Sequence, residues 1–311
     1  MTLTKLWQQR IGNQRDWVWR GWQTRYSYTR AKIESNTPLI LLHGFGAAIE
    51  HWRNNIPILG QEYHIYALDL LGFGASRKAK TNYSVYLWVE QVHDFWQTFI
   101  GEPVVLVGNS IGSLVCLTAA ITYPEMVKGI VMLSLPDVSI RQEMIPRWLQ
   151  PIVSTLENLV ASPLLLKTLL KILRRPSTIQ RWAGVAYQDK TAITDELVAI
   201  LSAPAYDEGS DKTFSALFKS VRQSNFAPSA KEVLPKLKIP ILLIWGNQDR
   251  MVPSNLAPVF AALNSQIKYI ELDRVGHCPH DECPERFNQI LLDWLKENFV
   301  QNEERRSRDL S

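Results

Sequence analysis

The pentapeptide Gly108-Asn109-Ser110-Ile111-Gly112 matches the pattern G-x-S-x-G. It follows the apolar run 104–107 and precedes helix-forming residues, which is the strand-to-helix context that this pattern needs to expose a nucleophilic serine. Glycine on both sides permits a turn tight enough to hold the serine in a strained conformation. We therefore predict that Ser110 attacks a substrate carbonyl, and a glycine-rich turn without chemistry is the alternative.

A serine hydroxyl near neutral pH needs a neighbouring base, and the base needs an acid that fixes its tautomer. His277 follows the last predicted strand, and Asp249 follows the strand before it. The carboxyl ends of parallel strands share one edge of a sheet, so residues far apart in sequence can meet there. The order Ser110, Asp249, His277 predicts a catalytic triad of nucleophile, acid and base.

Each partner of the nucleophile has a rival in the sequence. Asp137 follows another predicted strand and could act as the acid, and His280 could act as the base. Asp249 is favoured because it lies in a turn directly off a strand. His277 is favoured because Gly276 gives the backbone freedom at the strand exit.

Acyl transfer also needs hydrogen-bond donors directed at the developing oxyanion. One should be the backbone N–H of Ile111, directly after the nucleophile. The other should come from the loop His43-Gly44-Phe45-Gly46, where the glycines allow close approach, and Phe45 is the expected donor. His43 is expected to shape this loop rather than to react.

Two further segments have compositions that suggest ligand sites. Residues 277–283 contain two histidines and two cysteines, but Pro279 and the single-residue gaps hinder four ligands from closing on one ion. The loop 69–76 is rich in glycine, but it lacks the Gly-Lys-Ser/Thr ending and the G-x-G-x-x-G spacing of nucleotide-binding loops. We therefore expect no metal and no cofactor, and we expect packed thiols at the cysteines.

The elements that must position these residues alternate between strand and helix. The strand signals are short, almost wholly apolar runs at 39–43, 63–69, 104–108 and 129–133, and strands resume at 240–245 and 267–272. Helical patterns separate them, as a parallel sheet covered on both faces requires. An aromatic stretch over 17–28 predicts an antiparallel pair at the sheet edge. The fold class is therefore α/β, with a mostly parallel central sheet flanked by helices.

Strand signals disappear from residue 137 to residue 228, where helical, leucine-rich segments replace them. We interpret 137–228 as a helical cap inserted into a discontinuous core of residues 1–136 and 229–311. A final amphipathic helix is expected from about Pro284 to Phe299, and the polar tail 301–311 is expected to fray.

Charge and cysteine content limit the partners and the compartment. The 34 basic residues nearly match the 30 acidic ones, and the net charge of +4 is not gathered into a long basic block, which argues against nucleic acid as a partner. The first residues lack the apolar stretch of a secretory signal, and three cysteines are too few for a disulfide framework. These features predict a cytoplasmic protein, and they leave its oligomeric state unknown.

Four segments together resemble the α/β-hydrolases across nearly the whole core: residues 43–46, 69–76, 108–112 and 245–249. This resemblance implies the α/β-hydrolase fold and its serine hydrolase chemistry. Residues 108–114 and 275–281 are similar to the chlorophyll dephytylase and pheophytinase branch of photosynthetic organisms. That narrower resemblance implies chlorophyll catabolism by hydrolysis of a phytyl ester, with release of chlorophyllide and phytol, at the surface of a thylakoid membrane.

We therefore predict a serine esterase that cleaves a small, lipophilic carboxylic ester through an acyl-enzyme. The alternatives are carbon–carbon bond hydrolysis of a diketone by the same triad, and a ligand receptor that does not turn over. The cap segments 144–149 and 164–175 would make a lipophilic, basic-edged cover that could admit an isoprenoid chain or touch a membrane. Packing of the same leucines against the core is the alternative.

Overall fold

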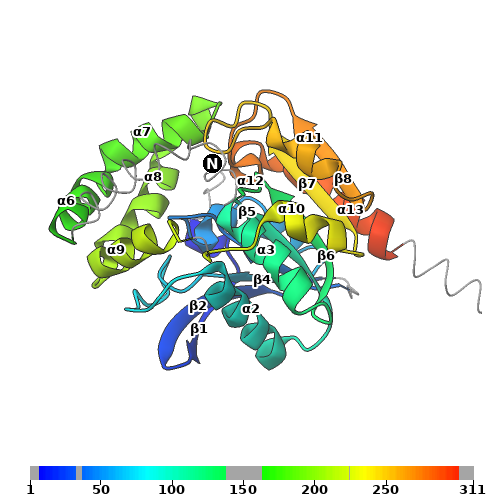
Figure 1. Cartoon of the computed structure of the whole chain (residues 1–311), viewed down its shortest axis with the longest axis horizontal. Coiled ribbons are helices and arrows are strands. Elements are labelled where there is room, and N and C mark those ends of the chain that lie inside the picture. The colour runs from blue at the N-terminus through cyan, green and yellow to red at the C-terminus, as the bar shows by residue number, and fades with distance from the viewer. Residues whose placement is uncertain (1–6, 33–36, 138–162, 224, 301–311) are drawn as a thin grey trace, which may run out of the picture.

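One twisted sheet forms the centre of the protein (Figure 1). The computed structural model describes residues 7–32, 37–137, 163–223 and 225–300, and within them eight strands join in the order β1-β2-β4-β3-β5-β6-β7-β8. Strand β2 pairs antiparallel with β1 and β4, and all other pairs are parallel. The predicted fold class is confirmed. The strands are β1 (Asn13–Trp19), β2 (Trp22–Thr29), β3 (Leu39–Leu42), β4 (Ile65–Leu68), β5 (Val104–Asn109), β6 (Val127–Leu133), β7 (Ile241–Gly246) and β8 (Ile267–Leu272).

Helices cover both faces of the sheet, so its central strands are buried. Successive side chains of a strand point to opposite faces. Ile40 of β3 therefore packs in the core layer that holds α2 and α3, whereas Leu41 packs in the layer that holds α1 and α13. The helices are η1 (Trp7–Gln9), η2 (Ile49–Trp52), α1 (Ile56–Leu59), α2 (Val85–Phe99), α3 (Ile111–Thr122), α10 (Ala230–Val233), η5 (Leu234–Lys236), α11 (Leu256–Ala261), α12 (Pro279–Glu282), α13 (Pro284–Leu295) and η6 (Lys296–Val300), together with those of the cap.

The cap helices follow β6 and form an arch beside the sheet (Figure 1). They are α6 (Pro163–Leu173), α7 (Pro176–Ala186), η3 (Lys190–Ala192), α8 (Asp195–Ser202), η4 (Ala203–Tyr206) and α9 (Ser210–Ser220). All of them fall inside the predicted range 137–228. The exact boundaries of cap and core stay a prediction. The cap segment 144–149 and the tail 301–311 lie outside the described residues.

The ends of the chain's elements differ slightly from the sequence expectations. The last helix begins at Pro284 as predicted, but α13 ends at Leu295 and a π-helical turn carries the chain to Val300. The uncharged run from Pro103 to Pro124 divides into β5 and α3. Within the part of the chain that the structure describes, no helix is long and apolar enough to cross a bilayer.

Candidate active site

Ser110 lies in the turn between β5 and α3 with φ 54° and ψ −113°, a conformation that L-amino acids rarely adopt. The two flanking glycines are required for space. A Cβ on Gly108 would lie 2.3 Å from the backbone of Gly112, and a Cβ on Gly112 would lie 2.3 Å from the carbonyl oxygen of Leu42 on β3. The close packing of α3 against the sheet therefore accompanies the strained backbone conformation of Ser110.

His277 and Asp249 form a hydrogen-bonded pair. The Nδ1–H of His277 donates to Asp249 Oδ2 at 2.8 Å, and the other carboxylate oxygen accepts the backbone N–H groups of Met251 at 2.8 Å and Val252 at 2.9 Å. Burial alone would raise the pKa of Asp249, but the hydrogen bonds from His277 and these N–H groups hold that pKa below its usual value. Asp249 is therefore ionised at neutral pH, which keeps the proton of His277 on Nδ1 and leaves Nε2 as a base.

Ser110, His277 and Phe45 line a single cavity of about 470 Å³. Most of its wall is apolar, and the charged residues in the described part of the lining are Lys78 and Arg174. Asp249 sits behind His277 rather than in the wall. Ile111 is the first residue of α3, and the first N–H groups of a helix have no partner within the helix. The structure thus brings the predicted nucleophile, base and one oxyanion donor into the lining of one cavity, and the second donor directly follows the nucleophile.

The rival residues have other partners. Asp137 accepts a hydrogen bond of 3.4 Å from the hydroxyl of Ser229. His280 is fully buried, with its ring centroid 4.2 Å from that of Trp52 and its Nε2 3.2 Å from His51 Nδ1. The geometry therefore favours Asp249 and His277, as the sequence did.

His43 shapes the loop that carries Phe45. Burial lowers the pKa of His43 to about 4, so its ring is neutral. Its Nδ1–H donates to the Gly44 carbonyl at 2.7 Å, and its Nε2 accepts the N–H of Leu70 at 3.1 Å. One histidine thus fixes the expected oxyanion loop to the loop that follows β4.

The glycine-rich loop after β4 is a wall of the cavity, to which residues 72–74 contribute. Its first residue, Asp69, is buried and accepts the N–H groups of Ile49 at 2.8 Å and Ala75 at 2.7 Å. Burial and the neighbouring Glu50 carboxylate raise the pKa of Asp69 to about 7. The Asp69 carboxyl therefore has a structural role: its hydrogen bonds connect the segment at Ile49 to the loop at Ala75.

Glu282 connects the His277 loop to the cap, a role that the sequence analysis missed. Its Oε2 accepts the N–H of Gly276 at 2.9 Å, while its Oε1 accepts the N–H groups of Gln188 at 3.0 Å and Asp189 at 2.8 Å. A carboxylate five residues after a candidate histidine, at the end of α12, was the only sequence signal. Glu282 therefore positions the backbone next to the base.

The reason for glycine at position 276 differs from the one expected. Gly276 does not adopt a positive φ, so backbone freedom is not what it supplies. A Cβ there would lie 2.1 Å from the carbonyl oxygen of Ala186 at the end of α7. The same carbonyl accepts the N–H of His277 at 2.7 Å. Glycine is required because the cap approaches the histidine loop so closely.

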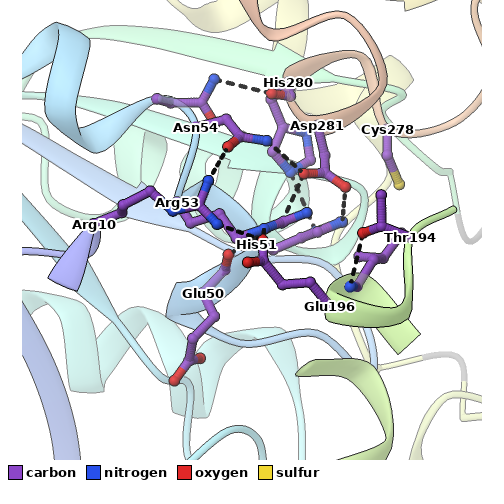
Figure 2. Close-up of polar contacts among 12 residues, drawn as sticks. Arg10, Glu50, His51, Arg53, Asn54, Thr194, Glu196, Cys278, His280 and Asp281 are labelled. Carbon is purple, nitrogen blue, oxygen red and sulfur yellow. Dashed lines mark hydrogen bonds and ion pairs between the residues drawn. The ribbon is translucent and has the colours of Figure 1, made fainter. Parts of the chain in front are cut away.

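A buried polar network connects His51 to the cap, and Figure 2 shows it. His51 Nε2–H donates to Tyr187 Oη at 2.7 Å, and the Tyr187 hydroxyl donates to Asp281 Oδ2 at 2.7 Å. Arg53 then bridges two carboxylates, donating from Nη1 to Asp281 and from Nε to Glu196, each at 2.7 Å. His51 and Tyr187 also line the cavity, so this network holds part of its wall in place.

Replacing His51 with Gln should weaken the acid sensitivity of the fold. Burial lowers the pKa of His51 to about 4, whereas an unfolded histidine titrates near 6.5. The stability contributed by the neutral ring is therefore complete above pH 6.5 and is lost as pH falls towards 4. Glutamine keeps a donor and an acceptor but does not titrate.

The measurement is urea unfolding of both proteins at about pH 7.5 and about pH 4.5, where the wild type should lose roughly 2–3 kcal/mol more than the variant. His280 Nε2 lies 3.2 Å from His51 Nδ1 and the His51 charge lowers the pKa of His280, so the difference reports the titration of this contacting pair. Equal losses would show that His51 does not remain neutral in the folded state.

The histidine- and cysteine-rich segment contributes to packing. Within the described ranges, no group of three or more His, Cys, Asp or Glu side chains could hold a metal ion. The three cysteines are free thiols, of which Cys116 and Cys278 are buried. Burial raises the pKa of Cys283 to about 11, so this thiol is protonated at neutral pH.

Comparison with known proteins identifies the group of chains to which this one is similar. The family model for the "alpha/beta hydrolase fold" matches residues 37–284. A 2-hydroxy-6-oxo-6-(2'-aminophenyl)hexa-2,4-dienoic acid hydrolase of Metapseudomonas resinovorans is 29% identical over 88% of this chain and 88% of its own length. The chloroplastic pheophytinase of Arabidopsis thaliana is 27% identical over 88% of this chain and 64% of its own length. The crystal structure of a serine hydrolase involved in carbazole degradation, the CarC enzyme, matches with a TM-score of 0.75 and 25% identity, over 91% of this chain and 98% of that one.

Proposed function

The chain belongs to the alpha/beta hydrolase fold family, and on that premise we propose that it is a serine hydrolase that cleaves a lipophilic carboxylic ester. One observation carries the proposal. A strained serine and the free face of a histidine–aspartate pair line the same large apolar cavity. An activated nucleophile requires this combination, and a passive binding pocket does not.

In the proposed reaction Ser110 Oγ attacks the ester carbonyl while His277 Nε2 takes the hydroxyl proton. The N–H groups of Phe45 and Ile111 stabilise the oxyanion of the tetrahedral intermediate, aided by the N-terminal end of the α3 dipole. His277 returns the proton to the departing alcohol. Water, deprotonated by the same histidine, then attacks the acyl-enzyme and releases the acid.

The cavity wall supports a lipophilic substrate. Cap residues Leu170, Leu173, Ile179 and Leu217 face the same space as Ser110, and the described residues of the lining include no Asp or Glu. Burying a substrate methylene in such a space contributes about 0.8 kcal/mol. Within this class we propose a phytyl ester of a chlorophyll-type pigment, supported by the likeness to pheophytinase and by the motif around Ser110. The photosynthetic membrane as its location stays a prediction.

Carbon–carbon bond hydrolysis is the second candidate. The relative from Metapseudomonas resinovorans is named for an oxo acid that has no ester, which is the kind of substrate that a carbon–carbon hydrolase cleaves. The same triad would serve both reactions. The ester is preferred here because the described wall is mostly apolar, whereas a dienoic acid is anionic. Lys78 is already bonded to Asp207 at 3.0 Å, which leaves Arg174 as the described lining cation that could pair with such an acid.

A substrate panel separates these candidates. We expect kcat/KM for p-nitrophenyl esters to rise at least about tenfold from the acetate to a medium-chain ester, because two further buried methylenes already supply that factor. Chlorophyll and pheophytin in detergent should release phytol. The panel also includes a 2-hydroxy-6-oxo-dienoate.

If the oxo-dienoate were turned over faster than every ester, the proposed activity would change from ester hydrolysis to carbon–carbon bond hydrolysis. A single stoichiometric release of product without further turnover would instead favour the receptor interpretation. Activity confined to short esters would contradict the lipophilic substrate.

A further inference from the structure

We propose that the outer face of α6 and α7 docks on a bilayer surface that contains anionic lipids. We call this surface the cap outer face and define it by Lys171, Ile172, Arg175, Arg181, Trp182 and Val185. The inference rests on the proposed function in one respect, since a lipophilic ester would enter the cavity from that bilayer. The binding itself requires no turnover.

Large apolar side chains are exposed on both helices of this face. Ile172 is 46% exposed, Trp182 is 55% exposed and Val185 is 39% exposed. Single exposed apolar residues are ordinary, but these belong to two successive helices at the outer edge of the cap (Figure 1). Other parts of α6 and α7, such as Leu166 and Ala183, are buried, so the two helices have apolar residues on an inner and an outer side.

The charge of the same segment has one sign. From residue 158 to residue 188 the chain has no Asp or Glu, whereas α6, α7 and the turn between them contain five basic residues. Among them Lys167 pairs with Asp211 at 3.5 Å. Lys171, Arg175 and Arg181 have exposed side chains, and no described carboxylate lies within ion-pair distance of them. Exposed apolar residues interspersed with unpaired cations are the pattern of interfacial helices that bind anionic lipid.

The entrance of the cavity adjoins this face. Trp182 belongs to the cap outer face and also lines the cavity. Phe45 and Met251 also line the cavity, and each is 48% exposed, so the rim around the entrance is apolar. A bilayer in contact with the face would therefore touch an apolar opening, and a lipophilic ester could enter without crossing water.

The test uses the full chain with Ser110→Ala, so that hydrolysis cannot alter the vesicles. Co-sedimentation is measured with vesicles of phosphatidylcholine alone and of phosphatidylcholine mixed with phosphatidylglycerol. We expect tighter binding to the anionic vesicles. Lys171→Gln with Arg175→Gln should weaken that binding about 30-fold, because each basic residue near an anionic surface contributes a factor of about five.

The matched control is Lys236→Gln with Lys238→Gln. These two exposed lysines lie just before β7, at the amino end of the strands and thus at the edge of the sheet opposite to Ser110. The charge change is identical, so unaltered vesicle binding would separate a local surface from an effect of net charge. Ile172→Ser with Val185→Ser should also weaken binding, at unchanged charge.

Three results would overturn the proposal. The first is equal binding to both vesicle types, and the second is an equal loss of binding in the double variant of the cap outer face and in the Lys236/Lys238 control. The third is a dimer that Ile172→Ser with Val185→Ser dissociates. The last would assign the face to a second copy of the chain. Hydrolysis of a short water-soluble ester by the same surface variants, with Ser110 intact, tests the proposed function separately. Hydrolysis by a protein that does not prefer anionic vesicles would refute the docking surface alone, whereas preferential vesicle binding without any hydrolysis would refute the proposed function alone.

Discussion

Replacing Ser110 with Ala should lower kcat by roughly 10⁵- to 10⁶-fold for every substrate that the wild type hydrolyses. The Ser110 hydroxyl is the protein group that bonds covalently to the acyl group in the proposed mechanism, and water attacks only the acyl-enzyme formed in that step, so its loss blocks the reaction. Covalent labelling by a fluorophosphonate probe should disappear in the same variant. The measurements are initial rates on the best ester of the panel, and labelling detected by mass spectrometry of the intact protein.

Ser134 provides a matched control for this substitution. It also follows a central strand, β6, and it has a φ of 50°, yet it is fully buried and is not among the residues that line the cavity. Ser134→Ala should keep both activity and labelling. If Ser110→Ala were still labelled at the wild-type rate, or if labelling were lost only with Ser134→Ala, the nucleophile would have been assigned wrongly.

The sheet could be predicted because its signals are local. Apolar runs such as 104–108 and 240–245 each coincide with an observed strand to within one residue, since a strand buried on both faces has no polar positions. The turn at Ser110 was also predictable, because glycine at 108 and 112 is demanded by contacts with the next turn and the neighbouring strand. The apolar runs thus encode strands that are buried on both faces, and the glycines encode close contacts between backbone segments.

The connections between cap and core could not be predicted in this way. Arg53 and Glu196 are 143 positions apart, and the glutamate that holds Gly276 also binds two cap residues 94 and 93 positions away. Charged residues usually lie on the surface, and nothing in their local pattern reveals a buried partner at such a distance. Gly276 illustrates the same limit. The glycine is visible in the sequence, but the reason that glycine is required is the nearby carbonyl oxygen of Ala186 in the cap, which approaches only in the folded chain.

Asp249→Asn should lower kcat by roughly 10³- to 10⁴-fold while the protein remains folded. The amide oxygen will take the position that accepts the N–H groups of Met251 and Val252, because an NH₂ group there would face two donors. The NH₂ group must then face Nδ1 of His277. Nδ1 becomes an acceptor, the ring proton moves to Nε2, and the histidine can no longer take the proton of Ser110.

Asp137→Asn is the control that decides between the two acids of the sequence. Asp137 also follows a central strand, but its described contact is with Ser229, so this variant should retain kcat within about threefold, the range of a substitution outside the site. Both variants are compared by ester hydrolysis and by thermal unfolding. Because tautomer control acts only on proton transfer, Asp249→Asn should lower kcat and leave KM nearly unchanged. A large loss of kcat in Asp137→Asn together with a small loss in Asp249→Asn would assign the role of the acid to Asp137. His277 would then have to turn away from the Asp249 carboxylate that it contacts in this structure.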